Sequence, residues 1–390
     1  MTRSVTLVLT DPAGRLLGAL PPFTVAAPWW QEVGEIVAEA GVDVTVLRLL
    51  SADRERPPGG HVTYLAVTPD RPAGLLPVDA DFGDHPKRAP YAEIGGPAAS
   101  LAWATGALDR IGIVDAIAHQ QRTWNLSALW RFDGPDGVPV AWLKQVPPFL
   151  AHEKAVLALV DKVVPGISPC LLAGGEQGRM LLAHVPGDDC YGAGPEVCDE
   201  AAASFHPVQE HFAGWADEMI KAGLPDKRPD IAQIAAVALP FFDRLDGLRQ
   251  LVEGLPRRLG RIEACGLPDT LIHGDLHPGN IRIDNYGPPV IMDWADAGVG
   301  NPAYDILRLV DSLDSAADAS GPLTAWADRW RDSRPGSDPV GVAALIRPVA
   351  ALQAAVTYAG FLDEIEPAEW PYHAGDVPER LSAAVAAAAD

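Results

Sequence analysis

The sequence has little of what marks zinc-binding, exported or membrane proteins. Only four of its 390 residues are cysteines, and Cys170, Cys190, Cys198 and Cys265 lack the paired short spacings of a zinc site. We therefore expect reduced thiols. The apolar stretch near the start breaks at Asp11-Pro12 without a cleavage site, and we expect no apolar run long enough to span a bilayer. These absences predict a cytoplasmic protein without a membrane partner.

Positive charge is also scarce. The chain has 30 Lys and Arg residues against 52 Asp and Glu, which gives a formal net charge of −22. A nucleic-acid-binding protein neutralises phosphates with clustered Lys and Arg, and no such cluster occurs here. The composition therefore argues against nucleic acid as a partner. An acidic surface suits a cationic substrate, but it also serves plain solubility, which we favour.

Hydrophobic patterning predicts two or three compact units in an α+β protein. Strand and helix signals alternate over residues 1–75, with strands expected at 5–9, 16–20, 42–50 and 61–68 and a helix at 30–40. Residues 69–97 are rich in Pro, Gly and Asp, which indicates a linker or a covering loop. We expect residues 1–97 to form an accessory α+β domain.

The rest of the chain divides into a strand-rich part and a helical part. Its pattern predicts strands at 127–133, 138–146 and 179–185, and helices at 98–108, at 151–160 and through most of 199–265. We expect a small lobe over residues 98–185 and a mainly helical large lobe over 186–390.

The strongest signal is LIHGDLHPGN at residues 271–280, followed by a turn at 284–289 and by VIMDW at 290–294. Short β-type runs on both sides of the turn predict a hairpin. If its strands pair in register, Asn280 and Asp293 become cross-strand neighbours. Asp275 lies on the loop just before Asn280. Two carboxylates and an amide then share one small volume, and oxygen ligands of this kind suit Mg²⁺.

These parts match the needs of phosphoryl transfer to a hydroxyl group. A carboxylate orients the attacking hydroxyl and accepts its proton, while metal ions neutralise charge on the nucleotide phosphates. Protein kinases place the base Asp before the metal-binding Asn with a fixed spacing, and Asp275 and Asn280 reproduce it. Any one of these residues alone would more often cap a turn or end a loop. Together with Asp293, the spacings favour chemistry.

This stretch resembles the aminoglycoside phosphotransferase and choline kinase family, over roughly residues 105–390. The resemblance implies a bilobal protein-kinase-like fold that uses ATP and Mg²⁺. It implies Asp275 as the catalytic base, with Asn280 and Asp293 as the Mg²⁺ ligands. The acceptor would be a hydroxyl group of a small molecule, and the oligomeric state stays unknown.

Three other residues of the motif region are expected to serve structure. The segment after the hairpin, GNPAYD at 300–305, also resembles the family, and Asp305 at its end would brace the catalytic loop. A histidine in such a loop more often bonds backbone than reacts. We therefore expect structural roles for His273 and His277.

The residues that bind the nucleotide should precede this motif. Only six lysines occur, and Lys144 alone lies in a strand pattern, with Glu153 on the next helix as its expected partner. No Gly-rich loop precedes Lys144. Backbone amides of residues 121–127 would take its place beside the phosphates, aided by Ser127 or Asn125.

Adenine recognition is inferred from the resemblance alone. The apolar strand before Pro186-Gly187 resembles the family's hinge, and backbone groups of Ala183 and Val185 would bond the base. The acceptor would lie near helices that follow the hairpin, where the acidic residues are Asp296, Asp311, Asp314, Asp363, Glu364 and Glu366.

Two rival functions remain open. The chain could be a catalytically inactive kinase-like binding module, which the complete set of chemical groups disfavours. It could instead be a Nudix-type hydrolase, because QEVGE at 31–35 is faintly similar to the Nudix box. That stretch lacks the arginine of the box and one of its paired acids, so we expect no hydrolysis there.

Overall fold

The structure, a computed structural model, describes residues 2–80, 82–284 and 287–389. They form two compact units. The first unit comprises Met1–Ala151, Leu171–His184 and Gly360–Gly375, and the second comprises His152–Cys170, Val185–Ala359 and Asp376–Asp390. The chain is 43% helix and 20% strand, which confirms the expected α+β class. The division into an accessory domain and two lobes stays a prediction.

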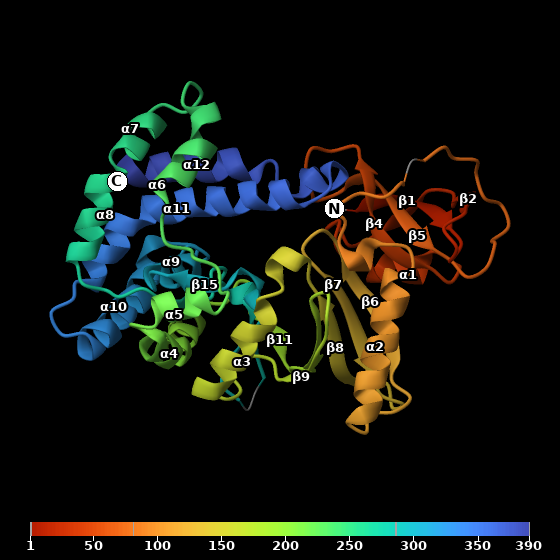
Figure 1. The fold of residues 1–390 in the computed structure, drawn as a ribbon, viewed down its shortest axis with the longest axis horizontal. Helices are drawn as coiled ribbons and strands as arrows, with labels where there is room; N and C mark the ends of the chain where they lie inside the picture. Colours follow the sequence, from red (N-terminus) through yellow and green to blue (C-terminus); the bar gives the residue numbers. More distant parts are fainter. Residues whose placement is uncertain (1, 81, 285–286, 390) are drawn as a thin grey trace. The chain divides into compact units, whose positions relative to one another are not determined.

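A five-stranded sheet opens the first unit (Figure 1). Its strands are β1 (Arg3–Thr10), β2 (Leu16–Ala19), β3 (Phe23–Val25), β4 (Thr45–Ala52) and β5 (Gly60–Val67). The order is β2-β1-β5-β4, with β3 also paired to β1. Strands β1 and β2 form an antiparallel hairpin, with Val8 opposite Ala19. Strand β1 runs parallel to β5.

Helix α1 (Gly34–Glu39) begins later than the helix expected at 30–40. The residues before it bond to another strand, because Glu32 bridges Arg122 and the N–H of Val33 donates to the carbonyl of Gln121 at 3.0 Å. Trp30 is fully buried and donates from Nε1 to the carbonyl of Gly59 at 2.7 Å. Tertiary contacts therefore override the helical pattern at its first turn.

A second antiparallel sheet of the first unit has the order β6-β7-β8-β10-β9. Its strands are β6 (Ile117–Thr123), β7 (Ala128–Asp133), β8 (Pro139–Gln145), β9 (Leu171–Gly174) and β10 (Arg179–Ala183). Helix α2 (Gly96–Arg110) contributes to the core on this sheet, with Ala104 and Leu108 packed among strand residues such as Phe132.

The segment Gly360–Gly375 belongs to the first unit although it comes from the far end of the chain. Its buried Tyr372 packs edge-on against Trp30, with ring centroids 5.6 Å apart. His373 Nε2 lies 2.9 Å from Asn125 Oδ1. This late segment therefore completes the core of the first sheet.

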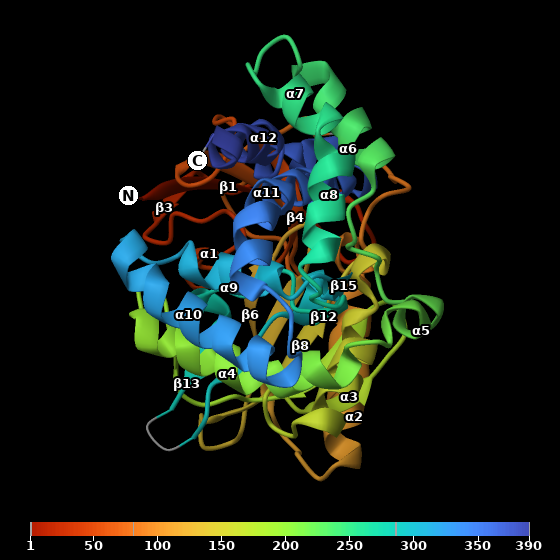
Figure 2. The same cartoon turned by 90° about the vertical axis from the view of Figure 1, so that its left-hand side faces the viewer.

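The second unit is mainly helical. Its helices are α3 (Glu153–Val163), α4 (Pro195–Phe212), α5 (Ala216–Lys221), α6 (Ile231–Ala238), α7 (Leu248–Glu253), α8 (Leu255–Ala264), α9 (Ala303–Val310), α10 (Ala316–Ser333), α12 (Asp376–Ala389) and most of α11 (Pro339–Glu364). Helices α4 and α10 lie side by side (Figure 2). His206 of α4 packs edge-on against Trp330 of α10 with ring centroids 4.8 Å apart.

By length and composition alone, α11 is long and apolar enough to cross a membrane, contrary to the expectation that no apolar run would be. Of its most apolar 18-residue stretch, 44% is buried. Core helices of soluble proteins can be equally long and apolar. This is weak evidence, and the cytoplasmic location stays a prediction. The four cysteines, all described, are free as expected.

Two small sheets carry the motif region in the second unit. Strands β12 (Thr270–Ile272) and β15 (Gly298–Gly300) pair with each other, while β11 (Asp188–Asp189), β13 (Ile281–Ile283) and β14 (Val290–Ile291) form the other sheet. The expected hairpin is confirmed, with Ile281 opposite Ile291. Part of its expected turn, residues 285–286, lies outside the described residues.

Candidate active site

The catalytic loop leaves β12 through a glycine. Gly274 has φ +83°, and a Cβ there would collide with the backbone oxygen of Asp296. Only glycine meets both demands at this position. The chain can therefore turn sharply between His273 and Asp275, which presents the carboxylate at the end of a buried strand.

Asp305 braces this loop, as expected. From α9, its Oδ2 accepts hydrogen bonds from the backbone N–H of His273 at 3.1 Å and from Gln209 Nε2 at 2.9 Å, and its Oδ1 accepts one from Gly274 N at 3.0 Å. The side chain is buried, and this burial raises the pKa of Asp305 to about 7 against the opposing effect of its donors. Asp305 thereby fixes the backbone just before Asp275.

The two histidines of the loop also bond backbone, as expected. His273 is fully buried, with Nε2 2.9 Å from the carbonyl of Met292, and burial lowers its pKa to about 4. His277 Nδ1 accepts from the N–H of Gly279 at 3.1 Å. The opposite nitrogen of His277 lies 3.5 Å from Asp275 Oδ2, so this ring also touches the carboxylate.

Asp275 is held by an arginine that the sequence reasoning missed. Arg308 Nε donates to Asp275 Oδ1 at 2.8 Å. Burial alone would raise the pKa of Asp275, but His277 and Arg308 lower it to about 2. A signal for Arg308 was available, because it lies three residues after Asp305 on a helix and so shares its face toward the loop. The arrangement keeps Asp275 ionised at any ordinary pH.

Asn280 lies directly against this carboxylate. Its Nδ2 donates to the backbone oxygen of Asp275 at 3.0 Å and lies 3.3 Å from Asp275 Oδ2. The amide nitrogen is therefore committed to the loop, which leaves the amide oxygen as the atom that a cation would use.

The hairpin register differs from the expectation by one residue. The N–H of Met292 donates to the carbonyl of Asn280 at 2.7 Å, so Met292, not Asp293, is the cross-strand neighbour of Asn280. Asp293 follows with φ +60°, a left-handed conformation that is costly for a residue with a side chain. The strand pattern could not reveal this turn, because it is a property of the backbone after β14. Strain of this kind clusters at functional sites.

A metal at this site must rely on few protein ligands. Among the described residues, no group of three His, Cys, Asp or Glu side chains could hold a metal ion. The exposed carboxylate of Asp293 and the amide oxygen of Asn280 are hard oxygen donors. Mg²⁺ commonly takes one or two such ligands and completes its shell with water and phosphate oxygens. The donor set therefore fits Mg²⁺.

Glu153, the first residue of α3, lies in the second unit with the motif. It is buried, and its Oε1 accepts from the backbone N–H of Trp294 at 3.1 Å. Glu153 therefore fixes the residue that follows Asp293. Its expected partner Lys144 lies on β8 of the first unit, opposite Leu129 and Met180, and is buried.

The other expected nucleotide-binding residues have these places. In the first unit, Ser127 Oγ accepts from Trp124 Nε1 at 3.0 Å, and Asn125 is buried against Glu369 and His373. Ala183 ends β10 opposite Ala141, whereas Val185 begins a stretch of the second unit. The segment expected as a phosphate loop is strand up to Thr123. Roles in nucleotide binding stay predictions for all of them.

Several expected acceptor-site acids are engaged elsewhere. Glu366 belongs to the first unit and accepts two hydrogen bonds from Arg88, at 2.9 and 2.8 Å, so we withdraw it from the acceptor site. Asp311 pairs with Arg347. In the first unit, the Nudix-like acids also have partners: Arg122 Nε donates to Glu32 Oε1 at 2.7 Å, and Glu35 accepts from Ala27 N at 2.9 Å.

Comparison with family models decides the class of the protein. The model described as "Phosphotransferase enzyme family" matches residues 128–340, which is more than half of the chain. The chain belongs to this family. The phosphotransferase is therefore a small-molecule kinase that acts on a hydroxyl group, as the motif predicted.

Solved structures are similar to this phosphotransferase in fold. An ethanolamine kinase from Plasmodium vivax has a TM-score of 0.51 and 12% identity, covering 73% of this chain and 86% of its own. A choline kinase from Cryptosporidium parvum has a TM-score of 0.50 and 11% identity, covering 74% and 95%. These likenesses confirm the bilobal protein-kinase-like class. Comparison with curated proteins gave no match.

Proposed function

We propose that the chain transfers the γ-phosphate of ATP to a hydroxyl group of a small, polar, amine-bearing molecule. The observation that carries this proposal is the Asp275 carboxylate, kept ionised by Arg308 and His277 beside Asn280. In the reaction, the acceptor oxygen forms a bond to the γ-phosphorus and the bond from that phosphorus to the β–γ bridging oxygen breaks. The hydroxyl proton passes to Asp275, and ADP leaves.

The low pKa of Asp275 limits what kind of base it is. A carboxylate whose pKa is about 2 is a weak proton acceptor. Phosphoryl transfer passes through a loose transition state in which the attacking oxygen has formed little bond, so positioning outweighs proton removal. Asp275 therefore contributes chiefly by orienting the hydroxyl, and it takes the proton late.

Asn280 and Asp293 are the proposed Mg²⁺ ligands. Bound there, Mg²⁺ would neutralise negative charge on the β- and γ-phosphates. Asn280 Nδ2 donates a hydrogen bond to the backbone oxygen of Asp275, which supports a role for the amide oxygen as the metal ligand. Glu153 supports Asp293 indirectly, by holding the N–H of Trp294.

The remaining nucleotide contacts are proposed from the kinase pattern. Lys144 would contact the nucleotide phosphates, since among the described residues it is the only lysine within a strand, β8. Ser127 and Asn125 would assist, and the backbone of Ala183 and Val185 would bond adenine. Because both ends of the Asn125 amide already have partners, we rank it below Ser127.

The acceptor is proposed to carry an amine. The chain has a net charge of −22, and Asp296 and Asp314 remain acidic residues of the second unit near the motif in sequence. A cationic acceptor gains from such a field. The two similar structures named above are kinases of amine-bearing alcohols, which guides the choice of compounds to test.

An acceptor screen tests the activity. The full chain is incubated with ATP and Mg²⁺ and with choline, ethanolamine, aminoglycosides and amino sugars, together with neutral sugars, and ADP formation is measured. We expect acceptor-dependent ADP release with at least one amine-bearing alcohol. Nucleotide binding without turnover on any compound would favour the inactive binding module instead.

Calorimetry tests the metal ligands separately from turnover. Asp293→Ala should abolish Mg²⁺-dependent ATP binding, and Asn280→Ala should weaken it by about tenfold, the loss typical of one charge-assisted contact. Asp243→Ala, at an acid whose side chain is 98% exposed, serves as the matched control and should bind as wild type. Unchanged Mg²⁺-dependent affinity in both site variants would refute the assignment.

A further inference from the structure

A cavity of about 620 Å³ lies in the first unit, on the sheet that contains β1, β4 and β5. Val8, Leu50 and Thr63 contribute from the sheet, residues 82–85 from the loop over it, and Glu366 from the late segment. Among the lining residues described, none belongs to the catalytic motif. The volume is in the range of small-molecule sites.

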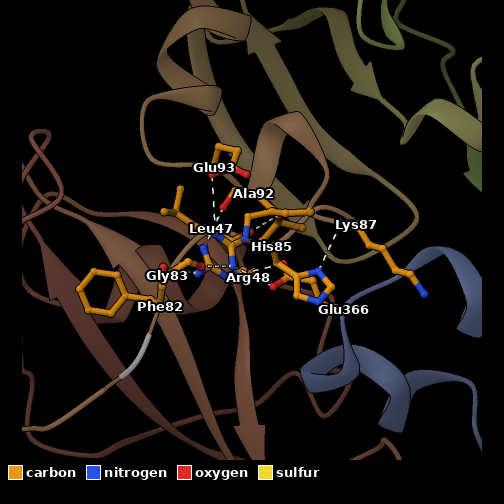
Figure 3. Close-up of polar contacts among 11 residues, drawn as sticks. Leu47, Arg48, Phe82, Gly83, His85, Lys87, Ala92, Glu93 and Glu366 are labelled. Atoms are coloured by element: carbon orange, nitrogen blue, oxygen red, sulfur yellow. Dashed lines mark hydrogen bonds and ion pairs between the residues drawn. The ribbon is translucent and has the colours of Figure 1, made fainter.

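Two arginines, Arg48 and Arg88, line this cavity. Figure 3 shows Arg48 among Phe82, Ala92 and Glu366. The side chains of Arg48 and Arg88 are only 4% and 5% exposed. Arg48 donates hydrogen bonds to the carbonyls of Ala92 at 3.1 Å and Phe82 at 3.3 Å. Arg88 donates two hydrogen bonds to the carboxylate of Glu366. The guanidinium groups are therefore fixed in place before any ligand arrives.

Each arginine still has a donor to offer. Among the described residues, the acidic oxygen recorded near Arg48 Nε is 3.8 Å away on Glu366, and the one near Arg88 Nη1 is 3.7 Å away on Glu93. Both distances exceed that of a hydrogen bond. Two charged N–H groups at the edge of one cavity thus lack a close acidic acceptor.

Buried charge around the cavity does not balance. Glu366 is the main buried negative charge beside the two arginines, because Glu93 is 42% exposed and burial favours the neutral form of Glu369. Burial raises the pKa of Glu369 to about 8, and the nearby Glu366 adds to this effect. Burial and then the charge of Arg88 lower the pKa of Arg48, which agrees with a surplus of positive charge. Asp79 and Asp84 line the cavity but are exposed, so water screens them.

The rest of the wall is apolar. Val8, Leu50, Val78 and Phe82 line the space beside the arginines. A bare inorganic anion would satisfy the arginines and leave this apolar space filled only by water. A ligand with a compact apolar body would fill it and gain from burial.

We propose that this cavity binds a small organic anion, with its carboxylate or phosphate group on Arg48 and Arg88 and its apolar body against Val8 and Phe82. The site is separate from phosphoryl transfer and does not depend on it. Because Glu366 comes from the segment Gly360–Gly375, an anion bound there also restrains that segment through Arg88.

Calorimetry with four matched probes tests this proposal. Benzoate and phenyl phosphate share one ring and differ in the anionic group, benzamide is the neutral analogue, and inorganic phosphate lacks the apolar body. The full chain is titrated with the ATP analogue AMP-PNP and Mg²⁺ present, so that nucleotide sites are filled. We expect saturable binding of benzoate or phenyl phosphate, at least about tenfold tighter than that of benzamide or inorganic phosphate.

Variants locate the binding. Arg88→Gln removes one guanidinium, and Ser51→Trp fills the cavity from an exposed position of β4 without touching the ion pairs. Each should weaken the aromatic anion by at least about tenfold, whereas Arg228→Gln, at an exposed ion pair of the second unit, should not. If Arg88→Gln does not fold, the affinity of Ser51→Trp for the aromatic anion still tests the proposal.

Hydrogen exchange gives a second measurement. Saturating benzoate or phenyl phosphate should slow amide exchange in peptides from residues 360–375 of wild type, and not in Ser51→Trp. The proposal is overturned if neither aromatic anion binds saturably, if benzamide or inorganic phosphate binds as tightly, or if Ser51→Trp retains wild-type affinity.

Discussion

Asp275 in the catalytic loop and the buried Glu369 of the first unit are both acidic residues, yet their pKa values move in opposite directions. That of Asp275 falls to about 2, and that of Glu369 rises to about 8. Asp275 has Arg308 at 2.8 Å and His277 at 3.5 Å. Glu369 Oε1 is buried and, among the described residues, has no hydrogen-bond partner, and the charges of Arg48 and Arg88 lower the pKa of Glu369 less than burial raises it.

The difference shows that burial sets the penalty while partners decide the charge state. A cation placed directly on the carboxylate more than offsets desolvation at Asp275. Among the described residues, none forms an ion pair with Glu369, so desolvation wins and the carboxyl group keeps its proton. One group is suited to chemistry because it is always ionised, and the other is a neutral part of a core.

The largest expected effect on turnover comes from removing the charge of the Asp275 carboxylate. Asp275→Asn should lower turnover by about 10²–10⁴, because the acceptor hydroxyl loses the group that orients it and takes its proton. Affinity for Mg²⁺-ATP and the free energy of unfolding should change little, since the isosteric amide fills the same space. Steady-state kinetics and calorimetry measure the two effects. Turnover near the wild-type value would remove Asp275 from the reaction.

Glu369→Gln should do the reverse, changing stability and leaving turnover intact. A carboxyl whose pKa is raised on folding, here from 4.5 to about 8, stabilises the fold below pH 4.5 and loses that contribution as pH rises through 8. The wild-type free energy of unfolding should therefore fall between these pH values, by up to about 1.4 kcal/mol per pH unit. Glutamine mimics the neutral acid and removes this slope.

Urea denaturation at pH 5, 6.5 and 8 measures this effect. The advantage of Glu369→Gln over wild type should grow with pH and reach about 1 kcal/mol or more at pH 8. Glu253→Gln, at an exposed helical glutamate, is the control and should show no trend. A difference between Glu369→Gln and wild type that does not depend on pH would mean that Glu369 is ionised in the fold.

Arg308→Gln should reduce the difference between the pKa values of Asp275 and Glu369. Without this cation the pKa of Asp275 rises from about 2, so the acidic limb of the kcat/KM profile moves toward neutral pH. At pH 5 the variant should lose up to about tenfold relative to wild type, and less at pH 8. Arg308→Lys should restore much of the profile. A uniform loss at every pH would assign Arg308 to acceptor binding.

The smallest expected effect is on KM, and it comes from the net negative charge of the whole protein. If the acceptor is a cation, KM for it should rise a few-fold between low and physiological salt, while kcat stays constant. A neutral acceptor from the same screen should show no such change. A KM for the cation that is independent of salt would mean that the acidic surface serves solubility only.

The short-range features of the site were predictable from sequence. The spacing of Asp275 and Asn280 and the hairpin after them depend on residues close in the chain. The bracing role of Asp305 was expected from the family resemblance, because the loop that it holds lies 31 residues earlier. The one-residue shift that places Met292 opposite Asn280 was not, because hydrophobic alternation does not fix where a strand ends. The left-handed backbone of Asp293 follows from the same cause.

Long-range contacts account for most of what was missed. Glu366 was named among the acidic residues near a possible acceptor site because it follows the motif, but it bonds to Arg88, far earlier in the chain. Sequence patterning reports the face of a helix or strand and not the element that will cover it. Similarly, the first turn of the helix expected at 30–40 is bonded to β6, a strand that the pattern did not predict.

The place of Tyr372 beside Trp30 has a consequence during translation. The strands of the first sheet have all been made once Val67 is added, but the ring that packs in its core is made only when synthesis reaches Tyr372. Until then a nascent chain on the ribosome exposes apolar surface at its oldest end, and closing so long a loop is slow. Released chains truncated before Gly360 should therefore depend on chaperones, and released chains that include the segment Gly360–Gly375 should not.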